Sequence, residues 1–189
     1  IGSWFDPGCT NKILTWKSWG GKLLLGPWGH CCIYRDLSDF PNAHYDWAGE
    51  HLRFYDQLLK GEDTGSLEEP PITYYTMGDT PGKEWHRSAD FPVEGTTFPK
   101  LYLSAGNTLE EAPTEKGSLS YTVREDIQLY EKMGRMNRHI TRDMTPEDGK
   151  SLAFTSAPLP KDLEITGVPI LDLWVTSTHT DGNFIAALE

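Results

Sequence analysis

The chain has 189 residues, of which 38% are hydrophobic and 24% charged, a composition typical of a globular protein that buries a core. Its net charge of −11 comes from 28 acidic and 17 basic residues, and no basic stripe offsets it, which argues against binding to nucleic acid. No apolar run approaches the length that crosses a membrane, so no membrane partner is expected.

The two ends of the sequence predict a piece of a longer chain. Residues 1–4 show neither an initiator Met nor the pattern of a signal peptide. Near the other end, residues 170–176 are typical of a strand, residues 181–183 of a turn, and residues 184–189 of a further strand cut at its last residue. We therefore expect a fragment, with an N-terminal part of its catalytic domain lying upstream.

Two short motifs near the start predict an acid and a base. Asp6 follows an apparent strand end, and His30 follows the apolar run Lys22–Leu25 and a Gly-Pro-Trp-Gly turn. The interval between them is long enough for a helix and a returning parallel strand, which would bring both residues to one sheet edge. In α/β-hydrolases the triad follows the order nucleophile, acid, histidine, so this chain would supply the last two members.

Each of these residues also has a structural interpretation. His30 could be an ordinary packed histidine, and Asp6 could be a turn or cap residue ahead of Pro7. Trp28 is either a packing residue or a wall of the substrate pocket, since aromatic side chains serve both roles. The matched acid upstream favours the catalytic interpretation of His30.

The three cysteines do not predict disulfides or a metal site. Their number is odd and Cys31 and Cys32 are adjacent, which favours a reducing compartment and, weakly, a cytoplasmic location. His30 with Cys31 and Cys32 is dense in zinc-ligand types, but adjacent residues rarely aim at one tetrahedral ion and Cys9 adds no matching pair. We expect neither a metal nor a cofactor.

An amphipathic helix is predicted over 46–60, with apolar side chains at helical intervals. Asp46 is a suitable N-cap, and Gly61 can take the left-handed conformation that ends a helix. We expect the apolar face of this helix to pack on the sheet.

The sequence changes character after Gly61, where an acidic, proline-containing linker begins. We place a domain boundary there, with residues 1–65 in the first domain and residues 66–189 in the second. Short β-rich runs between turns predict a β-sandwich or jelly roll for the second domain. These runs are 72–77, 100–104, 119–123, 152–156 and 163–167.

Two further segments lie between these runs. Residues 85–92, polar and aromatic, are expected to cover a sheet edge, with a contribution to a pocket as the alternative. Residues 125–148 are expected to be irregular and charged.

Several of these motifs together resemble the CocE/NonD family of serine hydrolases, which includes cocaine esterases and X-prolyl dipeptidyl-peptidases. The resemblance covers nearly the whole chain and rests on Ser-Trp-Phe-Asp at 3–6, Gly-Pro-Trp-Gly-His at 26–30, the helix ending at Gly61, and the segments 70–78 and 154–159. It implies the C-terminal end of an α/β-hydrolase domain followed by a partial jelly roll, with Asp6 and His30 in a triad. The serine and the oxyanion donors would lie upstream.

The sequence therefore predicts part of a cofactor-independent serine hydrolase that acts on small-molecule esters or amides and is inactive by itself. The alternative is a carbohydrate- or protein-binding jelly roll without catalysis. A metal-dependent hydrolase would need ligands that the sequence does not show. The oligomeric state, including a homo-oligomer, stays open.

Overall fold

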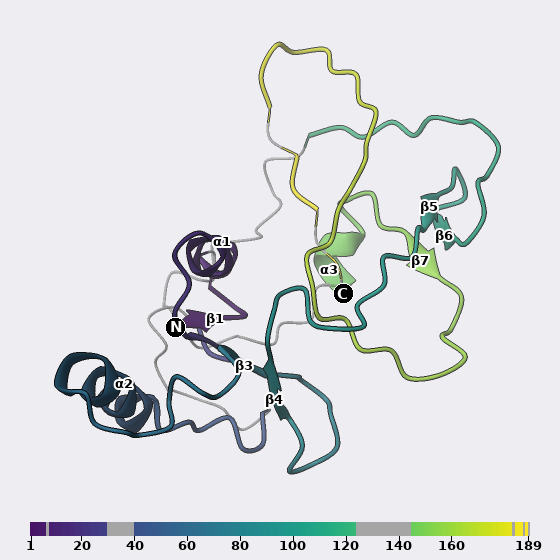
Figure 1. Ribbon diagram of the computed structural model, residues 1–189. Helices are drawn as coiled ribbons and strands as arrows, with labels where there is room; N and C mark the ends of the chain where they lie inside the picture. The colour runs from purple at the N-terminus through teal and green to yellow at the C-terminus, as the bar shows by residue number, and fades with distance from the viewer. Residues whose placement is uncertain (7, 30–39, 124–144, 183, 187, 189) are drawn as a thin grey trace.

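The computed structural model describes residues 1–6, 8–29, 40–123, 145–182, 184–186 and 188, and it contains two small β-sheets (Figure 1). The first sheet has the order β1 (Gly2–Ser3), β2 (Leu23–Gly26), β3 (Ile72–Tyr75) and β4 (Trp85–Ser88). The second consists of β5 (Tyr102–Leu103), β6 (Thr108–Glu110) and β7 (Thr155–Ser156). The helices are α1 (Cys9–Trp19), α2 (Trp47–Tyr55) and α3 (Thr145–Asp148).

The chain begins with a parallel β-α-β unit, as predicted. β1 pairs in parallel with β2, with Gly2 opposite Leu25, and α1 forms the crossover between them. α1 ends at Gly20, whose φ of 74° is a left-handed value that glycine adopts without steric cost. The carboxyl ends of β1 and β2 therefore lie at the same edge of the sheet.

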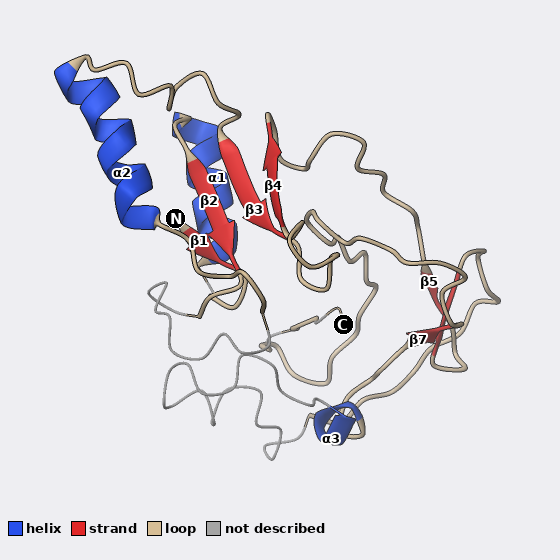
Figure 2. Cartoon of the chain, turned by 90° about the horizontal axis from the view of Figure 1, so that it is seen from below, coloured by secondary structure: helices blue, strands red, loops and turns tan. Residues whose placement is uncertain are grey.

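Apolar side chains cover both faces of the first sheet because successive strand residues point to opposite sides. On one face, Leu25 of β2 and Tyr74 of β3 pack with Ile13 of α1. On the other, Tyr75 packs with Phe40 and Ala43, which come after the second motif in the chain. Figure 2 shows α1 lying behind β2 and β3.

β3 and β4 extend this sheet beyond the predicted linker. β3 pairs in parallel with β2, and β4 pairs antiparallel with β3, placing Tyr75 opposite Trp85. The prediction that residues 85–92 only cover a sheet edge is therefore wrong, since residues 85–88 are themselves the edge strand. The division at residues 65 and 66 stays a prediction, with the constraint that segments from both sides of it share one sheet.

The predicted helix is present with both of its end signals, but its apolar face does not pack on the sheet. Asp46 accepts a hydrogen bond from the Gly49 N–H at 2.9 Å, and α2 continues as a π-helical turn, η2 (Asp56–Lys60), that ends at left-handed Gly61. No residue of α2 is buried, and Leu59 of η2 is 75% exposed. The expectation of packing was wrong because polar contacts orient this helix.

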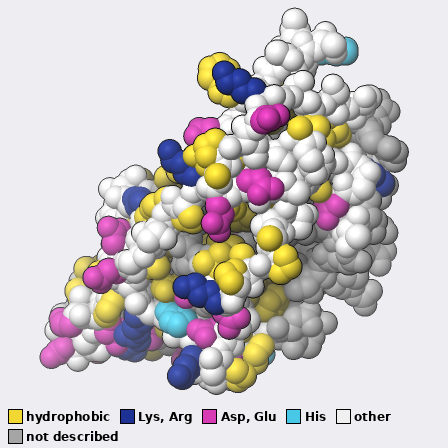
Figure 3. Space-filling model, turned by 90° about the vertical axis from the view of Figure 1, so that its right-hand side faces the viewer, with side chains coloured by type: hydrophobic (Ala, Val, Ile, Leu, Met, Phe, Trp, Pro, Cys, Tyr) yellow, Lys and Arg dark blue, Asp and Glu magenta, His cyan; other side chains and the backbone are white. Residues whose placement is uncertain are grey.

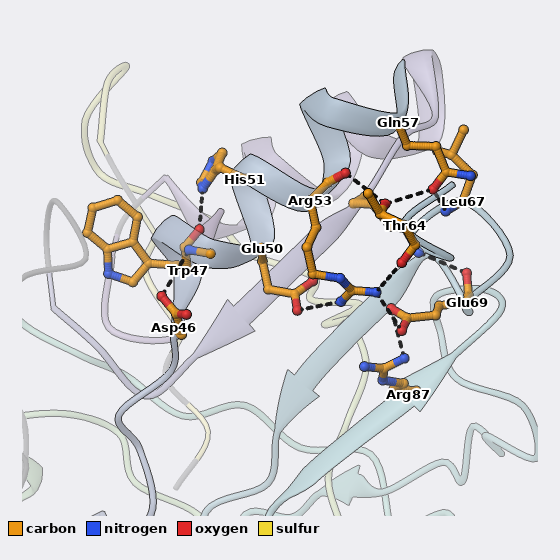
Figure 4. A network of polar contacts seen from close by, with 12 residues as sticks. Asp46, Trp47, Glu50, His51, Arg53, Gln57, Thr64, Leu67, Glu69 and Arg87 are labelled. Carbon is orange, nitrogen blue, oxygen red and sulfur yellow. Dashed lines mark hydrogen bonds and ion pairs between the residues drawn. The ribbon is translucent and has the colours of Figure 1, made fainter. Parts of the chain in front are cut away.

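Arg53 makes those contacts (Figure 4). Its guanidinium forms ion pairs with Glu50 at 2.8 Å and with Glu69 at 3.0 Å, and Glu69 also pairs with Arg87 of β4 at 3.0 Å. Thr64 of the linker also contacts α2, since its hydroxyl donates to the Arg53 carbonyl at 2.9 Å. The acidic linker is thus attached to both α2 and the sheet.

The second sheet is smaller than the predicted β-sandwich. Residues 102–103 and 155–156 form strands within two of the predicted runs. Residues 119–123, 163–167 and 170–176 form no β-ladder, and their apolar side chains are largely exposed. A strand needs a neighbour for its backbone N–H and C=O groups, and the described part of the chain provides none for these segments. Figure 3 shows acidic and exposed apolar side chains intermingled on one side of the molecule.

Replacing Glu69 with Gln should loosen the linker. Burial raises the pKa of the Glu69 carboxyl, but hydrogen bonds from Arg53 and Arg87 outweigh this and lower it below its ordinary value. Because the groups are partly exposed, we expect a loss of about 1 kcal/mol, or roughly fivefold faster amide exchange over residues 62–71 in the natural protein.

The pH dependence of this effect follows from the lowered pKa. A carboxyl with a depressed folded-state pKa stabilises the fold above its unfolded pKa of about 4.3, and this contribution disappears as the pH falls through the folded value. The difference between wild type and Glu69→Gln should therefore be complete at neutral pH, begin to shrink at about pH 4.3, and disappear once the pH has fallen through the lowered pKa of Glu69. Glu62→Gln is the matched control, and equal exchange in both variants would contradict the role of Glu69.

Candidate functional site

The residues after β1 and β2 are joined by two further backbone hydrogen bonds. The Trp4 N–H donates to the Gly26 carbonyl at 2.9 Å, and the Phe5 N–H donates to the Trp28 carbonyl at 3.3 Å. These bonds keep the two segments side by side just past the strands, although residues 3–6 already form a turn in which the Asp6 N–H donates to the Ser3 carbonyl at 3.0 Å. Asp6 follows the first of these segments, and Gly29 and His30 follow the second.

Asp6 is placed at the start of α1 by its own hydrogen bonds. Its Oδ1 accepts from the Gly8 N–H at 2.8 Å, and its backbone carbonyl accepts from the Cys9 N–H at 2.9 Å. The turn role considered for Asp6 is therefore observed. A carboxylate has two oxygens and several acceptor positions, so this role is compatible with a further hydrogen bond to an imidazole.

Cys9 is not suited to act as a nucleophile at this site. Burial, and then the nearby negative charge of Asp6, raise the pKa of its thiol to about 11. The thiol is therefore protonated near neutral pH, whereas nucleophilic attack requires the thiolate.

Trp28 is fully buried, and its contacts are those of a packing residue. Its indole N–H donates to the Ala43 carbonyl at 2.9 Å, and its ring lies 5.9 Å from that of Trp85, centroid to centroid. The ring also covers Gly26, where an added Cβ would meet three ring atoms at 2.6 Å. The substrate-binding role predicted for Trp28 is tested by none of these contacts and stays a prediction.

Two other aromatic residues donate to the same segment as Trp28. The Tyr75 hydroxyl donates to the Pro41 carbonyl at 2.6 Å, and the Trp85 indole N–H donates to the Asn42 carbonyl at 2.7 Å. We call Trp28, Tyr75 and Trp85 the aromatic anchor. Burial, and then the negative charge of Glu84, raise the pKa of Tyr75, which keeps its hydroxyl a donor.

Glu84 is a buried carboxylate beside the aromatic anchor and is only 1% exposed. The Asn42 amide donates to both of its oxygens, at 3.2 and 3.3 Å, and the Gly82 N–H donates to Oε2 at 3.0 Å. The pKa of Glu84 is lowered by hydrogen bonds from its own N–H, from Gly82 and from Asn42, which outweigh the effect of burial. Sequence reasoning missed this pair, which joins positions 42 residues apart.

A second polar pair was also missed. His86 Nε2 lies 2.8 Å from Asp79 Oδ2, and the imidazole stacks on Tyr74 at a centroid distance of 5.3 Å. The pKa of Asp79 is lowered first by the hydrogen bond from the Thr80 N–H and then by that of His86. This pair links the loop between β3 and β4 to β4.

His30, Cys31 and Cys32 lie outside the described residues, so the structure places Asp6 and Trp28 but not the histidine. It brings together the backbone at 5 and 28, one and two residues before the predicted acid and base. Among the residues that the structure describes, no three His, Cys, Asp or Glu side chains form a group suited to a metal ion. Within the same residues, no helix is both long and apolar enough to span a membrane.

Residues 65–189 match the sequence profile of the X-Pro dipeptidyl-peptidase C-terminal non-catalytic domain. The chain belongs to this family. Its CocE/NonD relatives include candidate serine esterases of Mycobacterium bovis and Mycobacterium tuberculosis, each 36% identical over 98% of the chain and 31% of the relative. The cocaine esterase of a Rhodococcus strain is 26% identical over 98% of the chain and 36% of that protein.

The CocE/NonD resemblance seen in the sequence is thereby confirmed. The chain spans about a third of the length of these curated relatives. The names of these relatives describe esterases, and the profile assigns a C-terminal domain to residues 65–189.

Replacing Gly26 with Ala should disturb the site through Trp28. The new Cβ would displace the indole and weaken its hydrogen bond to Ala43, and overpacking of this kind costs about 1–3 kcal/mol. Thermal unfolding of the natural protein, with near-ultraviolet circular dichroism to follow the tryptophans, measures both effects. Gly167→Ala is the control, since its nearest neighbour would be 3.9 Å away. A Gly26→Ala protein as stable as this control would contradict the packing role of Trp28.

Proposed function

We propose that this chain supplies the acid, Asp6, and the histidine, His30, of a serine hydrolase that cleaves esters or amides. The observation that supports the proposal best is that the segments after β1 and β2 stay joined, since the Phe5 N–H donates to the Trp28 carbonyl. Chemistry in open α/β sheets occurs outside the carboxyl ends of the strands, where Asp6 follows β1 and where the proposal also puts His30. A pure binding module has no use for an acid and a base at the ends of neighbouring strands.

In the proposed mechanism, His30 takes the proton of the serine as the serine attacks the carbonyl, and then protonates the leaving group. Asp6 would fix the tautomer of His30 and stabilise the imidazolium that forms. The hydrogen bond from Gly8 to Asp6 Oδ1 orients the carboxylate for this role. The reaction needs neither a metal nor another cofactor.

The serine and the oxyanion donors are proposed to lie in a segment outside these 189 residues. The curated relatives are about three times as long as the region that this chain matches, so they have room for such a segment. The exposed apolar face of α2 and η2, which includes Leu52 and Leu59, is a suitable surface for that segment to pack on.

For the architecture, we propose the end of an α/β-hydrolase domain over 1–65 and part of a jelly roll over 66–189. The parallel β1-α1-β2 unit supports the first assignment, and the profile match that begins at residue 65 supports the second. Whether the protein forms a homo-oligomer stays a prediction.

The alternative is a carbohydrate- or protein-binding jelly roll without catalysis. The observation that favours it is the profile's own description, which names the matched domain as non-catalytic. That match leaves out Asp6 and His30, so the two proposals differ in what residues 1–64 do.

Replacing Asp6 with Asn or His30 with Ala in the natural protein should lower kcat by about 10⁴-fold, the effect of losing a triad member. Asp63→Asn and His179→Ala are the matched controls, since both residues are exposed and neither has a role in the proposed triad. Ester hydrolysis with a chromogenic substrate measures the loss, and thermal unfolding verifies that each variant is folded. Near-normal turnover in either variant would exclude the proposed triad.

A fluorophosphonate probe, followed by intact-mass analysis, tests for the serine directly. A natural protein longer than these residues that gains one probe mass would support the serine hydrolase. The 189-residue chain by itself should gain none, because the nucleophile is expected elsewhere. Failure of the natural protein to react would favour the binding module.

A further inference from the structure

Three consecutive backbone carbonyls, at 41, 42 and 43, each accept a hydrogen bond from a different member of the aromatic anchor. Two of the donors, Tyr75 and Trp85, come from neighbouring strands of the sheet, and the third, Trp28, follows β2. Backbone carbonyls in a loop usually accept hydrogen bonds from water or from other backbone groups. Here the sheet itself fixes the position of the segment.

Asn42 adds a fourth connection through its side chain. Its backbone has a φ of 58°, a left-handed value that is uncommon for any residue except glycine and is tolerated best by Asn and Asp. Its amide donates to both oxygens of the buried Glu84 carboxylate. A buried charge is costly unless it is hydrogen-bonded, so the amide and the carboxylate depend on each other.

The segment at 40–43 also contacts the chain beside the predicted acid. The Phe40 ring lies 5.7 Å from the ring of Phe5, which directly precedes Asp6, and 6.5 Å from the ring of Tyr75. Trp28, which donates to Ala43, directly precedes Gly29 and His30. Trp28, two residues before His30 in the sequence, and the segment at 40–43 therefore lie together, next to the backbone that presents Asp6.

We propose that the Asn42–Glu84 pair, together with Tyr75 and Trp85, positions His30 relative to Asp6. This inference rests on the proposed function, because it assigns a role in the same triad. These four are positioning residues, since they act through the backbone around His30 and not on the substrate. Their effect should appear in kcat, because a displacement of about 1 Å in a reacting group can cost roughly 10²-fold in rate.

Replacing Asn42 with Asp in the natural protein tests the inference. The substitution keeps the left-handed backbone but sets a second carboxylate against Glu84, so the two should repel. We expect kcat per fluorophosphonate-titrated site to fall by about 10²-fold, with KM changed by less than about twofold. The acidic limb of the kcat/KM profile should move to lower pH, because a histidine farther from Asp6 loses the charge that raises its pKa.

The double variant Asn42→Asp/Glu84→Gln provides the rescue. It exchanges donor and acceptor, so the amide introduced at position 84 can donate to the carboxylate introduced at position 42, while the oxygen of that amide accepts from the Gly82 N–H. We expect kcat and the acidic limb to return towards the wild-type values. Tyr75→Phe removes only the hydroxyl that donates to the Pro41 carbonyl, introduces no charge, and should lower kcat by about tenfold. Tyr74→Phe removes a hydroxyl from the opposite face of β3 and should leave kcat unchanged.

The possible outcomes separate this inference from the proposed function. Full turnover in Asp6→Asn or His30→Ala would reject the triad, and the positioning role with it. If those variants are inactive but Asn42→Asp lowers only the melting temperature, with normal kcat per titrated site and an unmoved acidic limb, the positioning role alone is overturned. Recovery of the melting temperature without recovery of kcat in the double variant would also overturn it.

Discussion

The parallel pairing of β1 with β2 is the constraint on which the other features of the site depend. Two short strands of this kind need a crossover, which α1 provides, and Asp6 lies in the turn just before this helix. Past the strands, the Phe5 N–H donates to the Trp28 carbonyl and keeps the turn after β1 beside the segment after β2. Without this register, the segments containing the predicted acid and base would have no common edge.

Satisfaction of buried polar groups is the second organising element. The aromatic anchor combines a large buried apolar area with three hydrogen bonds to backbone carbonyls, so the same side chains contribute packing and orientation. Glu84 extends this arrangement with a charge that burial alone would disfavour. An apolar residue at position 84 would leave the Asn42 amide and the Gly82 N–H without this acceptor, which explains why a carboxylate occupies a buried position.

The features predictable from the sequence were those determined locally. The β1-α1-β2 unit follows from apolar runs and spacing, and the ends of α2 follow from Asp46 and Gly61. The orientation of α2 was not predictable, because Glu69 and Arg87, far along the chain, determine it. The Asn42–Glu84 pair was not predictable either, because its two residues lie 42 positions apart in the sequence. Strands predicted over 119–123, 163–167 and 170–176 did not form ladders, since strand formation depends on neighbours that a propensity pattern does not specify.

The orientation of α2 also has an energetic consequence. Its partly buried positions include Glu50 and Arg53, whereas Leu52, Leu58 and Leu59 are exposed. Burying one Leu side chain contributes about 1.5–3 kcal/mol, while a partly exposed ion pair contributes about 1 kcal/mol or less. Within these residues alone, the apolar face should therefore turn inward. The observed orientation is the one expected of a helix that is covered from outside, in agreement with a proposed upstream segment that packs against it and completes the triad.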